Sequence, residues 1–167
     1  MTTLDLQDRE ELIDRLEQFP LRLDEIVSAA SDEDLKKAGP GGSPGPVEVL
    51  AYLRDFEELF LERLTLMLNE DSPRFTRVED SLWPIERDYV NQDPLVMLHD
   101  FVEYRRQVVE ILSSLPPADW ERAGQHPVLG QLTVRSYAER VLERDREYEE
   151  QLLRVLGNRN DSQGETM

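Results

Sequence analysis

Apolar residues recur in steps of three and four along four stretches of the chain, and charged residues occupy the positions between them. This spacing is typical of helices that bury one face against other helices. We therefore expect long helices over residues 6–30, 46–69, 94–115 and 133–156. No stretch alternates apolar and polar residues convincingly enough to predict a strand.

The apolar stripes of these four helices define the expected core. They consist of Leu12, Leu16, Phe19, Leu23, Ile26 and Ala30 in the first helix, Leu50, Leu53, Phe60, Leu64 and Met67 in the second, Leu98, Phe101, Val108, Leu112 and Leu115 in the third, and Val134, Ala138, Val141, Tyr148, Leu152 and Val155 in the fourth. The first stripe keeps its phase across Pro20, but proline removes a backbone donor and clashes with the preceding turn. We therefore expect the first helix to kink or break near Phe19.

Capping residues and prolines mark the helix ends. Residues 31–34 have the pattern of a capping box that opens a short turn. The run GPGGSPGP ends in Pro46, which suits the first position of the second helix, and Asp93 before Pro94 predicts the start of the third. Thr133 supplies an N-cap hydroxyl for the fourth helix.

Four amphipathic helices predict an all-α fold, a four-helix bundle. Two long connections, residues 70–93 and 116–132, argue against short hairpins between all the helices. We expect the first to cover the bundle, anchored by Trp83 and Tyr89. Residues 1–156 then form a single bundle domain. Gly157 stands where a helix usually stops, so we expect residues 157–167 to be a disordered tail.

Composition and charge narrow the function. The chain has 36 acidic and 19 basic residues and a net charge of −17, which repels phosphate backbones and anionic lipid. We therefore expect no nucleic acid and no membrane as partners. No apolar run approaches the roughly 20 residues of a membrane helix, and the acidic amino end is unlike a signal peptide, so a cytoplasmic location is the expectation. The absence of cysteine from the sequence removes disulfides, thiolate nucleophiles and cysteine metal ligands.

Two charged residues, Glu57 and Arg105, fall within the apolar stripes of the second and third helices. A buried charge is costly unless it is paired, and a carboxylate can accept two parallel hydrogen bonds from a guanidinium. We expect the two side chains to meet inside the bundle. Their pairing either fixes the register of the helices or anchors a substrate.

A second group of polar residues consists of Tyr52 on the second helix and Arg144, Asp145 and Tyr148 on the fourth. Residues four apart share one side of a helix, so Arg144 and Tyr148 face the same way. One interpretation is amphipathic packing, with the phenol rings buried and the arginine stem spread over them. The other is a small pocket that binds an anionic small-molecule ligand.

Familiar catalytic and metal-binding patterns are missing from the sequence. His99 and His126 have no second histidine three or four residues away, as a helical metal site requires. The glycine-rich run lacks the lysine and hydroxyl residue of a phosphate-binding loop, and no serine nucleophile motif is present. We therefore expect no metal, no cofactor and no catalytic residues.

The chain resembles the DinB-like superfamily of bacterial four-helix bundles over residues 8–156. The resemblance rests on PVEVLAYLRDFE, the ERDY segment, FVEYRRQVVEIL, and DWER…HPVLGQLTV leading into VLERDREYEEQL. It implies an up-down-down-up bundle, a homodimer, and a divalent metal held by three histidines, one on the second helix and two on the fourth. The better-understood members are transferases or isomerases that use low-molecular-weight thiols.

In this chain the three histidine positions of the resemblance fall on Tyr52, Arg144 and Tyr148. A phenol with a pKa near 10 is a poor ligand for a divalent ion, and a protonated arginine cannot ligate. The resemblance therefore predicts the fold with a degenerate metal site. We expect a non-catalytic protein that binds a small ligand or a partner. The alternative is a thiol-dependent enzyme that uses these three residues in place of the metal.

Overall fold

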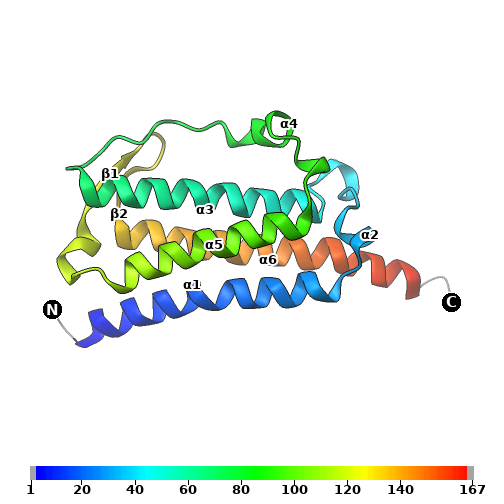
Figure 1. Ribbon diagram of the computed structural model, residues 1–167, viewed down its shortest axis with the longest axis horizontal. Helices are drawn as coiled ribbons and strands as arrows, with labels where there is room; N and C mark the ends of the chain where they lie inside the picture. The colour runs from blue at the N-terminus through cyan, green and yellow to red at the C-terminus, as the bar shows by residue number, and fades with distance from the viewer. Residues whose placement is uncertain (1–2, 165–167) are drawn as a thin grey trace.

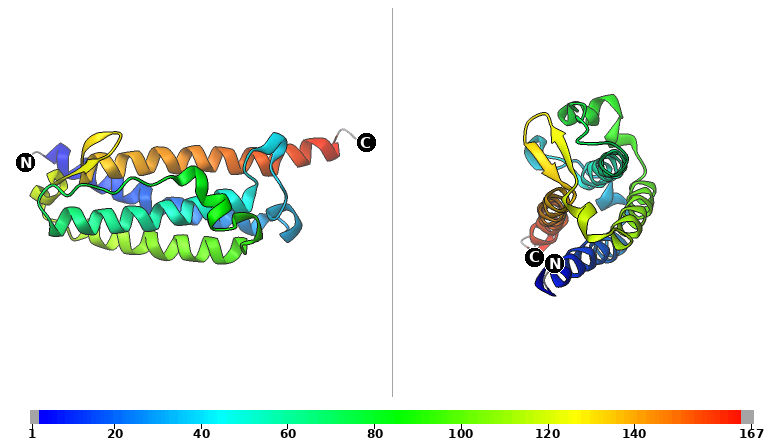
Figure 2. Two further views of the ribbon diagram at one scale, coloured as in Figure 1. Left: turned by 90° about the horizontal axis from the view of Figure 1, so that it is seen from above. Right: turned by 90° about the vertical axis from the view of Figure 1, so that its left-hand side faces the viewer.

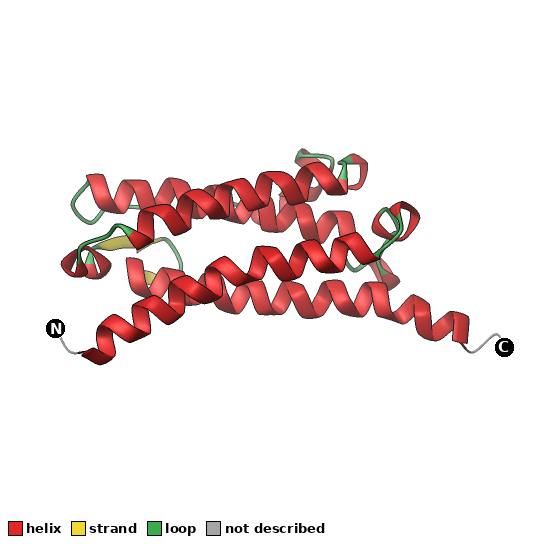
Figure 3. Ribbon diagram, turned by 60° about the horizontal axis from the view of Figure 1, so that its bottom comes forward, coloured by secondary structure: helices red, strands yellow, loops and turns green. Residues whose placement is uncertain are grey.

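The computed structural model describes residues 3–164, and the side chains of residues 7–157. Within this part of the chain, four long helices lie side by side along the molecule (Figures 1 and 3). They are α1 (Thr3–Ala29), α3 (Pro46–Asn69), α5 (Pro94–Ser113) and α6 (Val134–Gly164). Helices α5 and α6 each pack against both α1 and α3, so α1 and α3 occupy opposite corners of the bundle (Figure 2).

The helices have the expected up-down-down-up order. Helices α1 and α6 run in one direction, and α3 and α5 run in the other (Figure 1). The predicted all-α four-helix bundle is confirmed. Because α3 and α5 are parallel neighbours, the chain must return along the whole length of the bundle between them, which is why residues 70–93 form so long a connection.

This connection crosses the face of the bundle opposite α1 (Figure 1). It contains the short helices η2 (Asp80–Leu82), α4 (Trp83–Glu86) and η3 (Tyr89–Asn91). Trp83 and Tyr89 are 4% and 1% exposed, which confirms them as its anchors. Buried Asp55 on α3 accepts a hydrogen bond from the Tyr89 hydroxyl and lies 3.1 Å from the Arg87 guanidinium. A buried carboxylate on α3 therefore holds the end of the connection in place.

The predicted caps are confirmed by their hydrogen bonds. The backbone N–H of Asp34 donates to Ser31 Oγ at 3.1 Å, at the start of α2 (Asp32–Leu35). The backbone N–H of Leu95 donates to Asp93 Oδ1 at 2.9 Å, at the start of α5. The glycine-rich run contains only the short helix η1 (Pro40–Gly42), and Pro46 opens α3 as predicted.

We expect a kink or a break in the first helix near Phe19, and of these two the break is wrong. Helix α1 begins at Thr3 and continues to Ala29 with Pro20 inside it. Both Phe19 and Pro20 are buried. The apolar stripe keeps its phase across the proline, so packing of one continuous face against α5 and α6 outweighs the loss of a backbone hydrogen bond.

The helix end expected at Gly157 is also wrong. Helix α6 continues to Gly164, so residues 157–164 of the expected disordered tail are helical, and residues 165–167 lie outside the described residues. Gly157 does not have the positive φ of a left-handed cap. Glycine lowers helix propensity by about 1 kcal/mol relative to alanine without forbidding the helix.

A hairpin that the sequence did not predict precedes α6. After η4 (Pro117–Glu121), strand β1 (Ala123–His126) pairs antiparallel with β2 (Gly130–Thr133), and His126 lies opposite Gly130. The backbone of Gln125 also exchanges hydrogen bonds with the connection, donating to Pro73 O at 2.7 Å and accepting from Phe75 N at 2.9 Å. The strands are too short for periodicity to reveal them, because only Gly124 and Leu132 are buried.

Gly124 of the hairpin packs closely against Phe75 of the connection. A Cβ atom added there would overlap the ring of buried Phe75. We expect Gly124→Val to lower the free energy of unfolding by about 1–3 kcal/mol, because overpacking displaces the ring or the strand. Urea denaturation measures the effect. The control is Gly157→Ala, which meets no atom within 4 Å and should slightly stabilise α6. Equal stability of the two variants would contradict this packing.

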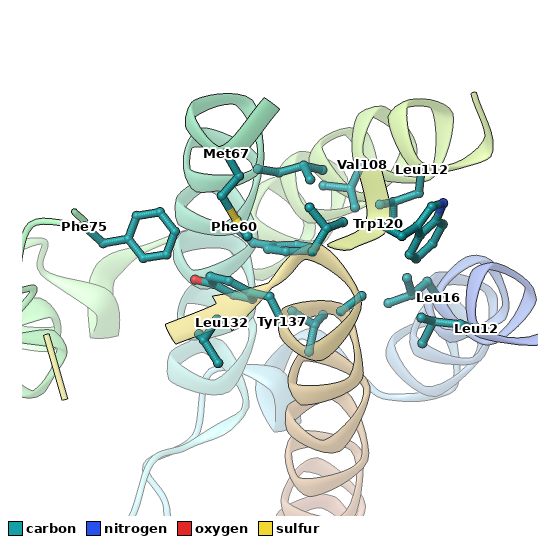
Figure 4. Close-up of a cluster of buried hydrophobic side chains, with 14 residues drawn as sticks. Leu12, Leu16, Phe60, Met67, Phe75, Val108, Leu112, Trp120, Leu132 and Tyr137 are labelled. Carbon is teal, nitrogen blue, oxygen red and sulfur yellow. The ribbon is translucent and has the colours of Figure 1, made fainter. Parts of the chain in front are cut away.

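The buried side chains form two apolar clusters, one towards each end of the bundle. The cluster at the hairpin end contains Phe60 and Trp120 (Figure 4). The cluster at the other end contains Phe19 and Phe101, whose rings meet edge to face at 5.8 Å. None of the helices in the described part of the chain is long and apolar enough to cross a membrane.

Candidate functional site

A buried ionic cluster lies where the two apolar clusters meet. Arg105 on α5 is 1% exposed, and it contacts Glu57 on α3 and Asp145 on α6, each 3% exposed. Arg105 Nε donates to Glu57 Oε1 and Nη2 donates to Oε2, both at 2.8 Å. Nη1 and Nη2 donate to the two carboxylate oxygens of Asp145 at 2.9 Å. One guanidinium thus joins three helices through two bidentate pairs.

The fifth N–H group of Arg105 explains how α1 tolerates its proline. Arg105 Nη1 donates to the carbonyl oxygen of Leu16 at 2.9 Å. In a regular helix that carbonyl would accept from the N–H of residue 20, but Pro20 has none. The carbonyl that Pro20 leaves free therefore becomes an acceptor for the buried guanidinium. All five N–H groups of Arg105 are satisfied, and the cluster reaches all four long helices.

The structure brings Glu57 and Arg105 together, as the sequence led us to expect, but it moves Asp145 to a different group. We had placed Asp145 with Tyr52, Arg144 and Tyr148, whereas its side chain turns to Arg105. The position of Asp145 in the sequence could have indicated its pairing with Arg105. Asp145 interrupts the apolar stripe of the fourth helix in the same way that Glu57 and Arg105 interrupt theirs.

The cluster buries two carboxylates but only one guanidinium. The pKa values of Asp145 and Arg105 are shifted by this burial and by the neighbouring charges. Burial raises the pKa of Asp145 to about 6, and the Glu57 charge adds to the rise, although Arg105 opposes it. Burial alone would lower the pKa of Arg105, but the charges of Glu57 and Asp145 more than offset this and raise it. The folded state therefore binds a proton at Asp145 more tightly than the unfolded chain does.

This raised pKa predicts a pH dependence of stability. Between about pH 4 and pH 6 the folded protein binds the proton on Asp145 and the unfolded chain does not, so stability falls as pH rises through this window. The shift from 3.8 to about 6 corresponds to about 2–3 kcal/mol. We expect the difference in unfolding free energy between wild type and Asp145→Asn to fall by this amount across the window, measured by urea denaturation. A difference that stays flat across this window would contradict the prediction.

The second predicted group lies in a cluster of aromatic rings between α3, α6 and the connection. The rings of Tyr52 and Tyr148 stack with their centroids 6.2 Å apart. Tyr52 also meets Tyr89 edge to face at 5.1 Å, and Phe56 packs against Trp83 at 5.0 Å. The structure therefore brings Tyr52 and Tyr148 together as packed rings.

Arg144 lies against the same cluster. Its guanidinium carbon lies 4.1 Å from the centroid of the Phe56 ring, a cation–π contact. Burial raises the pKa of Tyr148 to about 12, which Arg144 partly opposes, and burial followed by the charge of Asp80 raises the pKa of Tyr52. Both phenols are therefore neutral at neutral pH, so each hydroxyl keeps a proton that it could donate and is not an anionic ligand.

A cavity of about 490 Å³ opens next to this cluster, between α3, α6, the connection and the tip of the hairpin. Phe56 and Arg63 line it from α3, and Arg140 and Arg144 line it from α6. Of the three residues predicted to form a ligand pocket, Arg144 lines this cavity, and Tyr52 and Tyr148 lie in the neighbouring aromatic cluster. Its volume lies in the range of small-molecule binding sites.

His126 faces this cavity, although the sequence offered no reason to select it. Its Nδ1 atom accepts hydrogen bonds from the backbone N–H groups of Val128 and Leu129, both at 3.1 Å. This pairing places the proton of the neutral ring on Nε2. Burial lowers the pKa of His126, and the charges of three arginines that line the cavity lower it further. The ring is therefore a neutral N–H donor in a positive environment.

Metal ligands are not gathered at either group. In the part of the chain that the structure describes, no three His, Cys, Asp or Glu side chains lie close enough together to hold a metal ion. His99 is exposed on α5, where its Nδ1 lies 3.7 Å from Asp100, and His126 lies on the hairpin. The two histidines are on different elements and share no site.

Comparison with known proteins identifies the family. YfiT from Bacillus subtilis, whose structure is described as that of "a probable metal-dependent hydrolase with an unusual four-helix bundle topology", shares the fold with a TM-score of 0.81 at 20% identity, covering 94% of this chain and 90% of YfiT. A protein of Oceanobacillus iheyensis named "putative metal-dependent hydrolase" is 23% identical over 131 residues, which are 78% of this chain and 75% of that protein. The sequence profile of the DinB superfamily matches residues 15–145. The chain therefore belongs to the DinB superfamily.

Proposed function

We propose that this protein is a member of the DinB superfamily without the three-histidine metal site, and that it is a non-catalytic protein that binds a small ligand. The proposal is carried by the side chains at the positions that the family resemblance assigns to the three histidines. Two of them, Tyr52 and Tyr148, are neutral phenols stacked at 6.2 Å, and the third, Arg144, is a cation.

These side chains do not suit a divalent cation. A phenol whose pKa is raised holds its proton at neutral pH, so it offers only a weak neutral oxygen. Arg144 adds a positive charge next to the rings, in contact with Phe56. A second cation at this place would be repelled by the first. The aromatic cluster instead fills the space between α3 and α6 with apolar contacts.

The adjoining cavity supports a binding role. Its lining combines apolar residues such as Phe56 and Leu132 with charged groups of both signs, the combination that gives small-molecule sites both affinity and orientation. The connection and the hairpin that border it are held to each other by the backbone pairing of Gln125 with Pro73 and Phe75. This side of the cavity is therefore formed by two segments joined through backbone hydrogen bonds rather than by an isolated loop.

Metal retention tests the proposal. We expect wild-type protein incubated with zinc or nickel and then desalted to retain far less than one metal ion per chain, measured by elemental analysis. One retained equivalent that is lost in Tyr52→Phe or Tyr148→Phe would contradict the proposal. That result would favour the metal-dependent hydrolase activity for which the two relatives are named.

A thiol-dependent enzyme that uses Tyr52, Arg144 and Tyr148 is the alternative. The raised pKa of both phenols would suit donation of a hydrogen bond to a developing oxyanion. Thermal-shift measurements with small thiols and thiol conjugates separate the two functions. Stabilisation by a thiol that is lost in Tyr148→Phe would favour the enzyme.

A further inference from the structure

Charges of both signs line the cavity: the basic residues are Arg63, Arg77, Arg140 and Arg144, and the acidic ones are Glu79, Asp80, Glu143 and Glu147. Three arginines, Arg63, Arg140 and Arg144, act on the imidazole of His126 at the hairpin end. At the other end, the charge of Asp80 acts on Tyr52 and Tyr148. In a chain whose net charge is −17, the cavity lining thus has as many arginines as acidic residues, and three of the arginines act on its hairpin end.

Two of these arginines, Arg140 and Arg144, differ from the third in their contacts, and Arg144 packs its guanidinium against the Phe56 ring at 4.1 Å. Arg63 is committed to the protein, because it donates to the Tyr137 hydroxyl at 3.1 Å and to Thr76 O at 3.0 Å. Arg140 and Arg144 line the cavity and, among the residues that the structure describes, form no ion pair. The fourth arginine of the lining, Arg77, pairs with Glu79 at 3.0 Å.

His126 adds a neutral donor to these two charges. The hairpin turn occupies its Nδ1 atom, which leaves Nε2–H as the polar group available to a ligand. In the same cavity, Phe56 and Leu59 of α3 supply an apolar surface next to the Arg144 guanidinium. Carboxylates and phosphates are the groups that arginine recognises best through paired N–H donors.

We propose that the cavity binds a small organic anion, whose carboxylate or phosphate group lies at the hairpin end between Arg140, Arg144 and His126 and whose apolar part packs against Phe56. This inference rests on the proposed ligand-binding function and names the chemical class of the ligand. It also gives His126 the role of orienting the anion.

Calorimetric titration at constant ionic strength tests the inference with benzoate, phenyl phosphate and the neutral analogue benzamide. We expect the wild-type protein to bind at least one of the two anions and to bind benzamide at least about tenfold more weakly, because benzamide lacks the charge that the arginines recognise. The anion with the higher affinity identifies the head group as carboxylate or phosphate.

The double variant Arg140→Gln/Arg144→Gln should lose at least about tenfold in affinity for the preferred anion, and Arg140→Lys/Arg144→Lys should lose less because it keeps the charge. The matched control is Arg146→Gln/Arg154→Gln, two arginines of α6 that do not line the cavity, with unchanged affinity. Circular dichroism of each variant without ligand checks the fold.

Equal binding of benzamide, unchanged affinity in the double glutamine variant, or no binding of either anion by the wild type would each overturn the inference. Metal analysis of the same preparation is independent of these results. A protein that retains no metal and binds no anion would contradict the ligand class while leaving the loss of the metal site supported. A protein that retains one metal ion would contradict the proposed function itself.

Discussion

Replacing Arg105 by methionine is expected to lower the free energy of unfolding by about 3–5 kcal/mol, the largest effect that we predict for any single substitution in this chain. The change leaves Glu57 and Asp145 as two carboxylates in the interior without a cation. It also leaves the Leu16 carbonyl without its donor. Urea denaturation at neutral pH, followed by circular dichroism, measures the loss.

The matched control is the next residue of the same helix. Arg106 is 59% exposed and pairs with Glu103 at 2.7 Å and Glu110 at 3.1 Å on the surface of α5. We expect Arg106→Met to change stability by no more than about 0.5 kcal/mol, because exposed ion pairs contribute little. If the two methionine variants were equally stable, the buried cluster would not have the energetic role described above.

A triple substitution separates charge from packing. Converting Arg105→Met together with Glu57→Met and Asp145→Leu removes all three charges and fills the space with apolar atoms. Replacement of a whole buried ion group is often neutral, whereas removal of one partner is costly. We expect the triple variant to regain most of the stability that Arg105→Met loses. A triple variant less stable than the single one would indicate that the cluster contributes mainly through shape and hydrogen bonding.

Introducing histidine at Tyr52, Arg144 and Tyr148 together is expected to turn a protein that retains almost no zinc into one that retains about one equivalent. Three imidazoles would replace two neutral phenols and a cation. The 6.2 Å between the Tyr52 and Tyr148 rings brings α3 and α6 close enough for side chains to share an ion at the usual zinc–nitrogen distance of about 2.0–2.1 Å. Elemental analysis after desalting measures the gain, and zinc should also raise the unfolding temperature of the variant.

Its control is the variant Tyr52→Phe/Arg144→Gln/Tyr148→Phe, which removes the same polar groups without supplying ligands and should retain no more zinc than the wild type. The outcome tests the assignment of the three positions as well as the proposed function. If the histidine variant bound no zinc, these positions would not correspond to the metal site of the superfamily, and the main support for a metal-free function would be lost.

The helices of this protein could be read from its sequence because their signals are local. A stripe with a period near four identifies the buried face of each helix, and a capping side chain such as Asp93 acts within one turn. The same logic fails where a local preference competes with packing. Pro20 and Gly157 each disfavour a helix, yet both α1 and α6 continue through them.

The residues of the candidate site could be predicted only in part, because packing between distant segments also decides their contacts. The sequence marks three charged residues for burial because each lies within an apolar stripe, and they are Glu57, Arg105 and Asp145. It does not indicate which carboxylates pair with the guanidinium. Nothing in the sequence singles out His126. Its role depends on a hairpin of two four-residue strands, whose position is decided by contacts with a segment about fifty residues earlier in the chain.

Periodicity and caps along the chain were thus enough to establish four helices, their buried faces and the family resemblance, because each of these depends on residues a few positions apart. Tertiary structure alone decided that Arg105 would join four helices and take the carbonyl that Pro20 leaves free, and that Arg140, Arg144 and His126 would line one cavity. The physical reason is that burial and long-range pairing set the energy of a charged side chain, and neither is encoded by its neighbours in sequence.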